Sequence, residues 1–318
     1  MSPPRRARWR LRRPVTAMVT VLALTACAVE PPPGQRPVPA PAPAATPPQS
    51  AASAKAQAYY AQVQQALLSQ GLLRTDGGGE DTPFNERQLA ENFIRIALFD
   101  EYDRGAGGAA IQRQTVSQLR RWVQPVRVGL RFGRSVPPGQ QASDRARVAS
   151  YLARLQGLTG HPIRLDDSNP NFLVHIVNEE ERQALGPALR AALPGVGNPD
   201  VAGMTDMPPS TYCLVYAQSS GTTSTYTGAF AVIRAEHPDL LRLSCLHEEI
   251  AQGLGLPNDS PSARPSIFND DEEFALLTRQ DELMLRMLYD PALRPGMTEA
   301  EARPIIHSLA SRLMGGKS

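Results

Sequence analysis

The chain has 318 residues, of which 42% are apolar, and this fraction suffices to bury a core and excludes a globally disordered chain. Six of its 33 basic residues lie among the first 13 positions, so the rest holds 27 basic against 31 acidic residues, a net charge of −4. A mildly acidic body argues against nucleic acid as a partner.

The first 26 residues have the pattern of a secretory signal peptide. A strongly basic start is followed by an apolar run from Val15 to Leu24, which is shorter than the roughly 20 residues that span a bilayer. The run ends in Leu24-Thr25-Ala26-Cys27, which resembles the lipobox of bacterial lipoproteins. The resemblance implies cleavage before Cys27 and acylation of Cys27, which would anchor the chain at a membrane. An ordinary signal peptide followed by a chance cysteine is the alternative.

The lipobox resemblance also bears on which membrane holds the chain. Ala28 is not the aspartate associated with inner-membrane retention, so we expect an outer-membrane lipoprotein that faces the periplasm, with the inner membrane less favoured. Residues 27–50 then form a tether, because nine prolines lie between residues 31 and 48, interleaved with alanine. This composition predicts an extended, polyproline-like segment. A proline-rich motif that binds a partner is the alternative.

Residues 51–318 are predicted to form one globular domain of the α/β (α+β) class, in which a mixed sheet packs on helices and additional helices precede it. Apolar periodicity predicts helices at residues 51–73, 85–102, 115–122, 145–158, 240–254 and 279–289. Alternating or continuous apolar runs predict strands at residues 125–132, 163–165, 171–177, 213–218 and 228–233. The strand at 171–177 alternates enough to serve near an edge of the sheet.

The two cysteines of this domain are Cys213 and Cys245. In an oxidising compartment they predict one disulfide that closes a loop of about 30 residues and contributes roughly 3 kcal/mol to stability. The alternative is that Cys245 is a free thiol beside a functional helix.

The predicted helix at 240–254, which contains Cys245, carries a segment that resembles a zinc-peptidase motif. His247-Glu248 begins like HExxH, but Ala251 stands where the second histidine would be. One residue later, the segment from Glu248 to Asn258 has the spacing of H-E-x-x-H-x-x-G-x-x-H, the long zinc motif of metzincin peptidases. Its general-base position is Glu249, and its glycine, where the helix must turn sharply, is Gly255.

All three zinc-ligand positions of that motif are replaced, by Glu248, Gln252 and Asn258. Further on, Ser266-Ile267-Phe268 stands where metzincins place their methionine turn, and residues 277–289 look like the closing helix of matrix metalloproteinase-like domains. This resemblance covers about residues 228–289 and implies a zincin-like fold.

The chain resembles more closely the bacterial lipoprotein family labelled domain of unknown function 2927. The signature of that family combines three segments, which here are Glu248–Asp259, Ser266–Asp270 and Leu277–Tyr289. The resemblance implies no established activity.

The chemistry of the replaced ligands argues against zinc. On a helix, Glu248, Glu249 and Gln252 share one side, opposite the apolar residues, and Asn258 can fold back toward them after the Gly255 turn. Carboxylate and amide oxygens suit calcium or magnesium better than zinc, and so few carboxylates would bind weakly. We therefore expect no resident cofactor, neither zinc nor more than weakly bound calcium.

Three interpretations of this helix face follow. The favoured one is a catalytically silent, zincin-like scaffold that binds envelope peptides or proteins. The second is a metal-free hydrolase of envelope peptide or peptidoglycan, in which Glu248 or Glu249 acts as acid or base. The third is an ordinary solvated helix face unrelated to zincins. His247 lies toward the apolar side of the helix and is predicted to be a partly buried structural residue.

Overall fold

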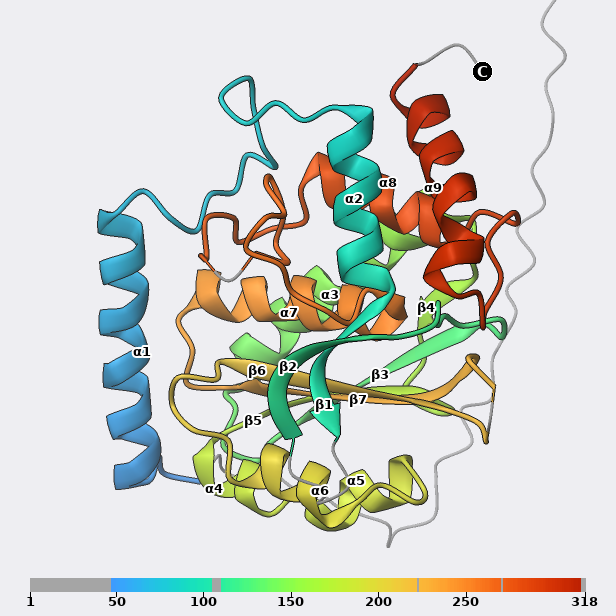
Figure 1. Ribbon diagram of the computed structural model, residues 1–318. Helices are drawn as coiled ribbons and strands as arrows, with labels where there is room; N and C mark the ends of the chain where they lie inside the picture. Colours follow the sequence, from blue (N-terminus) through green and yellow to red (C-terminus); the bar gives the residue numbers. More distant parts are fainter. Residues whose placement is uncertain (1–46, 105–109, 222, 270, 316–318) are drawn as a thin grey trace, which may run out of the picture. The chain divides into compact units, whose positions relative to one another are not determined.

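The computed structural model (Figure 1) describes residues 47–104, 110–221, 223–269 and 271–315. The predicted signal peptide, Cys27 and most of the predicted tether lie outside these residues. The described helices are α1 (Ala51–Ser69), α2 (Glu86–Ala97), α3 (Pro138–Thr159), α4 (Glu179–Gln183), α5 (Gly186–Ala192), α6 (Asn198–Thr205), α7 (Asp239–Gly255), α8 (Arg279–Leu288) and α9 (Glu299–Leu313). The strands are β1 (Phe99–Arg104), β2 (Ala110–Val116), β3 (Val126–Phe132), β4 (Ile163–Leu165), β5 (Phe172–Val177), β6 (Cys213–Ser219) and β7 (Tyr226–Arg234).

The centre of the fold is a five-stranded mixed sheet with the strand order β4-β3-β5-β7-β6. The first four of these strands run parallel, and β6 pairs antiparallel with β7 at one edge. This arrangement confirms the predicted α/β class. The prediction that residues 171–177 lie near an edge is wrong, because β5 is the central strand and five of its six residues are buried. Both faces of a central parallel strand are covered, so its alternation carries no information about an edge.

Helices cover both faces of this sheet (Figure 1). On one face, α3 and α7 pack against the strands, and α8, α2 and α9 form a further layer beyond them. On the other face, α4, α5 and α6 pack over β7 and enclose a smaller apolar cluster. The two faces therefore have separate cores, and α7 lies between the sheet and the outer helices.

The segment between α2 and β3 differs from its prediction. The predicted helix at 115–122 is wrong, since β2 extends to Val116 and the following residues pair with distant parts of the chain. Leu119 exchanges backbone hydrogen bonds with residues 296–297, and Arg121 with residues 224–226. The predicted helix at 85–102 ends earlier, at Ala97, because the chain then enters β1, which pairs with β2. Local spacing of apolar residues could not reveal these partners.

Four described helices were not predicted. Helices α4, α5 and α6 are only 5, 7 and 8 residues long, too short for a clear apolar period. The fourth, α9, contains Pro304 in its interior, which argues against a helix on sequence grounds. Its start nevertheless carries a signal, because Thr298 and Glu301 form a capping box.

The N-terminal helix α1 docks beside the sheet through a small apolar cluster and one buried hydrogen bond. Tyr60 is buried and packs edge-on against His237 with ring centroids 4.4 Å apart. The Ser53 hydroxyl donates to the carboxylate of Glu236 at 2.8 Å, and both side chains are buried. The helix that follows the predicted tether is therefore held by the domain at the end of β7.

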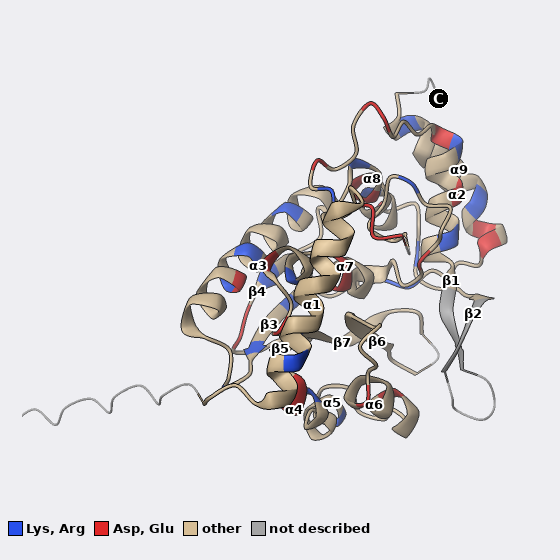
Figure 2. Ribbon diagram, turned by 90° about the vertical axis from the view of Figure 1, so that its left-hand side faces the viewer, with Lys and Arg blue, Asp and Glu red and all other residues tan. Residues whose placement is uncertain are grey.

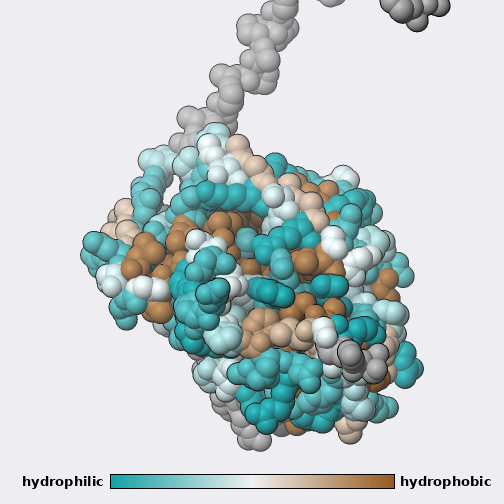
Figure 3. All heavy atoms as spheres, turned by 90° about the horizontal axis from the view of Figure 1, so that it is seen from above, coloured by the Kyte–Doolittle hydropathy of each residue, from teal (hydrophilic) through white to brown (hydrophobic). Residues whose placement is uncertain are grey.

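Several charged residues on the outside of the fold form ion pairs. Figure 2 shows basic residues along α3, and three of them contact carboxylates. Arg145 pairs with Asp167 at 2.6 Å, Arg154 pairs with Glu282 at 2.6 Å, and Arg147 pairs with Asp239. On the face seen in Figure 3, apolar areas are separated by polar residues. In the described ranges, no helix has the length and hydropathy needed to cross a bilayer.

Candidate functional site

Helix α7 carries the modified motif, and its end is set by a glycine. Gly255 has φ +128°, a conformation that side chains with a Cβ rarely adopt. A Cβ added there would also lie 2.3 Å from the carbonyl oxygen of Arg120. The sharp turn that the motif predicts at Gly255 is therefore present, and only glycine fits it.

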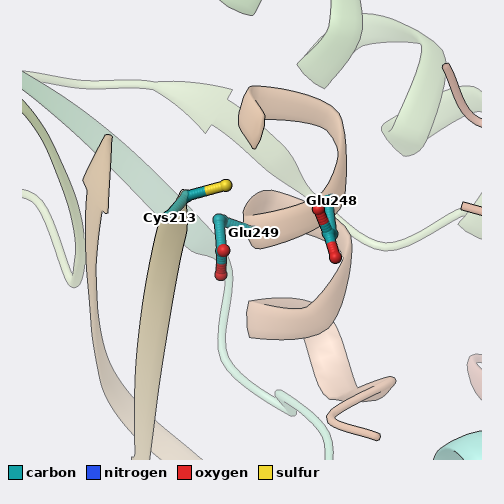
Figure 4. Close-up of side chains that lie close together, drawn as sticks. All are labelled: Cys213, Glu248 and Glu249. Carbon is teal, nitrogen blue, oxygen red and sulfur yellow. The ribbon is translucent and has the colours of Figure 1, made fainter. Parts of the chain in front are cut away.

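The two glutamates of the motif lie beside the start of β6. The Cys213 Sγ atom and one carboxylate oxygen from each of Glu248 and Glu249 lie within 4.8 Å of one another. Figure 4 shows Cys213 reaching from β6 toward the helix that carries both glutamates. Glu249 is 4% exposed, whereas Glu248 and Cys213 are partly exposed. The cluster is therefore accessible from one side and closed on the other.

The sulfur in this cluster belongs to a disulfide. Cys213 and Cys245 are bonded, with their Cα atoms 5.8 Å apart, which confirms the predicted disulfide and excludes a free Cys245 thiol in this form. The bond ties the edge strand β6 to α7 across a sequence separation of 32, and a loop of this size contributes roughly 3 to 4 kcal/mol. A disulfide sulfur is not a thiolate ligand. In the oxidised form, the metal ligands among Cys213, Glu248 and Glu249 are therefore the two carboxylates.

The other two motif positions have different partners. The Gln252 amide donates to the carboxylate of Asp259 at 3.0 Å. The Asn258 amide donates to the carbonyl oxygen of Arg95 at 2.7 Å, and its backbone N–H donates to that of Ile96 at 3.2 Å. Asn258 thus satisfies carbonyls at the C-terminal end of α2, which lack partners within that helix.

The structure therefore brings Glu248 and Glu249 together and gives Gln252 and Asn258 separate hydrogen-bonding roles. Gln252 is 9% exposed and Asn258 is 1% exposed. The third interpretation, a solvated helix face, is wrong for Glu249, Gln252 and Asn258, because all three are buried. Asp259 was not a predicted site residue. Its position directly after Asn258, in the family signature, is the signal that could have identified it.

His247 has the structural role that its position on the helix predicts. Its Nδ1 atom accepts a hydrogen bond from the Leu277 backbone N–H at 3.2 Å, and its ring stacks on Tyr151 with centroids 3.9 Å apart. Burial, together with the charge of Arg154, lowers the pKa of His247 to about 3. The ring is therefore neutral at physiological pH and connects α7 to the segment that precedes α8.

A buried aspartate connects the other two signature segments. The Asp281 carboxylate accepts hydrogen bonds from the Ser266 hydroxyl at 2.5 Å, the Ile267 N–H at 3.0 Å and the Thr278 N–H at 2.9 Å. Burial raises the pKa of this carboxyl to about 6. Its sequence signal is the capping box that Thr278 and Asp281 form at the start of α8. The family signature thus describes three segments that hold one another in place.

A second charged cluster lies near the same end of β7, where this strand meets α4. The Glu179 carboxylate pairs with Arg182 at 2.5 Å and with Arg234 at 2.6 Å, and both arginines are 2% exposed. Arg182 and Arg234 also donate to the carbonyl oxygens of Met204 and Met207. Burial raises the pKa of Glu179, but the two guanidinium groups outweigh it, so the pKa is lowered. These contacts hold the helices of the second face on the sheet.

A shallow cavity of about 270 Å³ opens near the end of α7, and its lining includes Arg121, His161 and Tyr289. The His161 Nε2–H donates to the carbonyl oxygen of Gln124 at 2.9 Å, and Arg121 donates to the carbonyl oxygen of Leu293 at 2.8 Å. Both side chains therefore donate hydrogen bonds to backbone carbonyl oxygens. No sequence signal pointed to this cavity.

Comparison with known families gives one result. The model of a family described as "Protein of unknown function (DUF2927)" matches residues 86–308. No curated protein and no solved structure matches the chain. The matched range contains α7, the disulfide and all three signature segments.

Proposed function

The chain belongs to the family described as "Protein of unknown function (DUF2927)". From the geometry of its site we propose that the protein is a non-catalytic envelope lipoprotein whose zincin-like domain binds peptide or protein segments. The observation that carries this proposal is the set of hydrogen bonds made by the side chains that stand where the metzincin motif has zinc ligands. Gln252 and Asn258 donate to Asp259 and to the Arg95 carbonyl oxygen. A hydrolytic zinc needs three converging ligands and an open position for water, and these two side chains serve the fold instead.

The zincin-like relationship is supported by the surroundings of α7. The helix ends at a glycine turn that no other residue fits, and the segments that follow return to pack against it. Ser266 and Ile267, at the place of the methionine turn, are held by Asp281 of the closing helix α8. These contacts match the order of elements that the metzincin resemblance implies.

The proposed binding surface is the free edge of β6. Among the described residues, the backbone of β6 pairs with β7 on one side and with no strand on the other. All seven of its residues are partly exposed, unlike those of β5 and β7. An unpaired strand edge is a template for an extended peptide, whose main chain adds as a further strand.

The charge beside this edge defines the partner. Glu248 and Glu249 lie next to the first residue of β6, and Gln252 on the same helix contacts Asp259, which follows the end of that helix. An acidic surround favours an extended segment that carries lysine or arginine. Acylated Cys27 and the proline-rich tether would hold this surface near a membrane, with the outer membrane and the periplasm as the proposed location.

The proposal is tested by peptide binding to the full chain. Fluorescence anisotropy compares extended peptides that contain lysine with matched peptides that contain glutamate, at low and high salt. We expect the basic set to bind more tightly, the difference to shrink with salt, and backbone hydrogen exchange to slow in residues 213–219 on binding. Equal binding of both sets, or binding without protection of β6, would refute the proposal.

A second function is favoured by one observation, the approach of two carboxylates within 4.8 Å. An acid and base pair requires two carboxylates in different surroundings, and here Glu249 is buried while Glu248 is partly exposed. Incubation with peptidoglycan and with a peptide library tests for turnover. Product formation that is lost in Glu249→Gln but kept in Glu180→Gln, an exposed glutamate on α4, would replace the binding proposal by a metal-free hydrolase.

A further inference from the structure

The disulfide lies directly beside the two carboxylates of α7. The Cys213 sulfur is within 4.8 Å of an oxygen of Glu248 and of Glu249. Cys245, its bonded partner, is one helical turn before Glu249 and lies on the same side of α7. Two sulfurs and two carboxylates therefore gather between β6 and α7.

The ligand capacity of this group depends on the oxidation state of the sulfurs. A dithiol reductant transfers two electrons and two protons to the disulfide, which becomes two thiols while the dithiol becomes its own disulfide. The sulfurs then separate. A divalent metal that binds them displaces the thiol protons, because the thiolate is the ligand. Thiolates and carboxylates are both zinc ligands, and four of them complete a tetrahedral set.

We propose that the reduced protein binds one zinc ion through Cys213, Glu248 and Glu249, with Cys245 as fourth ligand, and that the disulfide form does not. The burial of the group fits such a site. Cys245 is 2% exposed and Glu249 is 4% exposed, which provides a dry inner side. Cys213 and Glu248 are partly exposed and leave a route for the ion.

The site differs from the zinc position that the metzincin motif implies, although both include Glu248. That position would use residues 248, 252 and 258, whereas the proposed site uses the strand β6 in place of Gln252 and Asn258. Glu248 and Glu249 also interact with other groups in the fold, so the ion competes with these contacts. The inference does not depend on the proposed peptide-binding function.

The test uses the full chain with Cys27→Ser, in which Cys213 and Cys245 are the remaining cysteines. The protein is titrated with Zn²⁺ and with Co²⁺ before and after reduction by a dithiol, which is removed without air. We expect one ion per reduced chain, with thiolate-to-cobalt charge-transfer absorption, and at least 100-fold weaker binding before reduction. Equal affinity in both forms, or no binding by a reduced chain that keeps its far-ultraviolet circular dichroism, overturns the proposal.

Single variants keep the test decisive if reduction unfolds the chain. In the Cys27→Ser chain, adding Cys245→Ser leaves Cys213 as the remaining cysteine, a free thiol without any reductant, and we expect this variant to bind Co²⁺ with the charge-transfer band. Adding Glu249→Gln to this variant should weaken binding at least tenfold, whereas adding Glu180→Gln should not. Loss of the band in folded Cys245→Ser, or equal effects of the two glutamine substitutions, contradicts the assigned ligands.

Discussion

Two clusters of charged side chains lie near the C-terminal end of β7, one against α4 and one against α7, and they differ in which groups they bring together. Around Glu179, one carboxylate lies between two buried guanidinium groups, and backbone carbonyls accept the remaining N–H groups. On α7, two carboxylates of like charge lie together beside a disulfide. In the first arrangement opposite charges are paired inside the fold, whereas the second brings two carboxylates together beside the partly exposed edge strand β6. The comparison indicates that the first cluster stabilises the fold, whereas the second belongs to the binding surface that we propose.

The largest expected effect comes from breaking the balanced cluster. Glu179→Ala leaves Arg182 and Arg234 buried without their carboxylate, and removing one partner of a buried ion pair costs about 3 to 5 kcal/mol. Urea unfolding followed by circular dichroism measures the change. The neighbouring exposed Glu180 provides the control, and Glu180→Ala should cost well under 1 kcal/mol. Similar losses for both variants would show that the ion cluster is not what stabilises this end of the sheet.

A second, smaller effect is expected in the pH dependence of stability, and it arises from His247 on α7. The pKa of His247 is about 3 in the folded protein because the ring is buried, and about 6.5 in the unfolded chain. As pH falls from 7 to 5, the unfolded state takes up a proton that the folded state refuses, so stability decreases by about 2 kcal/mol at this residue.

His247→Asn keeps an acceptor near the Leu277 N–H and removes the titration. The difference in unfolding free energy between pH 7 and pH 5 should therefore be smaller in this variant than in the wild type. Other groups that titrate, including Asp281, contribute equally to both proteins and cancel in the comparison. His307→Asn on α9 serves as the control substitution. An unchanged pH dependence in His247→Asn would show that this ring does not link pH to stability.

The smallest expected effect is the difference in stability between substitutions of the two amides of the motif. Asn258→Ala removes the donor to the Arg95 carbonyl oxygen at a site that is 1% exposed, and an unpaired buried carbonyl costs about 1 to 3 kcal/mol. Gln252→Ala removes only the contact with Asp259, at a site that is 9% exposed, and should cost less. Thermal and urea unfolding measure both. A larger loss in Gln252→Ala would mean that Gln252, and not Asn258, is the structural member of the pair.

Much of the sheet and of α7 could be predicted from the sequence because the signals are local. The β5 and β7 runs are strongly apolar, and α7 has a clear apolar side. Gly255 could be predicted to end the helix because its position in the motif requires a residue without a Cβ. Two cysteines in one domain were enough to predict the disulfide between β6 and α7.

The partners of side chains far apart in the sequence could not be predicted in the same way. The motif suggests that Asn258 turns back toward Gln252, yet it binds the end of α2, 163 residues earlier in the chain. The apolar spacing at 115–122 is compatible with a helix, but the backbone there pairs with residues near 225 and 297. The spacing of apolar residues describes one segment only. It gives no information about a distant segment that pairs with the same backbone groups.

By itself, the sequence determined the α/β class, the helix that carries Glu248 and Glu249, the glycine turn and the pairing of the two cysteines, because each depends on residue types at short or unique separations. Tertiary structure alone decided that β6 is the exposed edge, that its first residue lies beside Glu248 and Glu249, and that Asn258 caps another helix. These features arise from the packing of segments distant in the chain, and packing depends on all of the segments together.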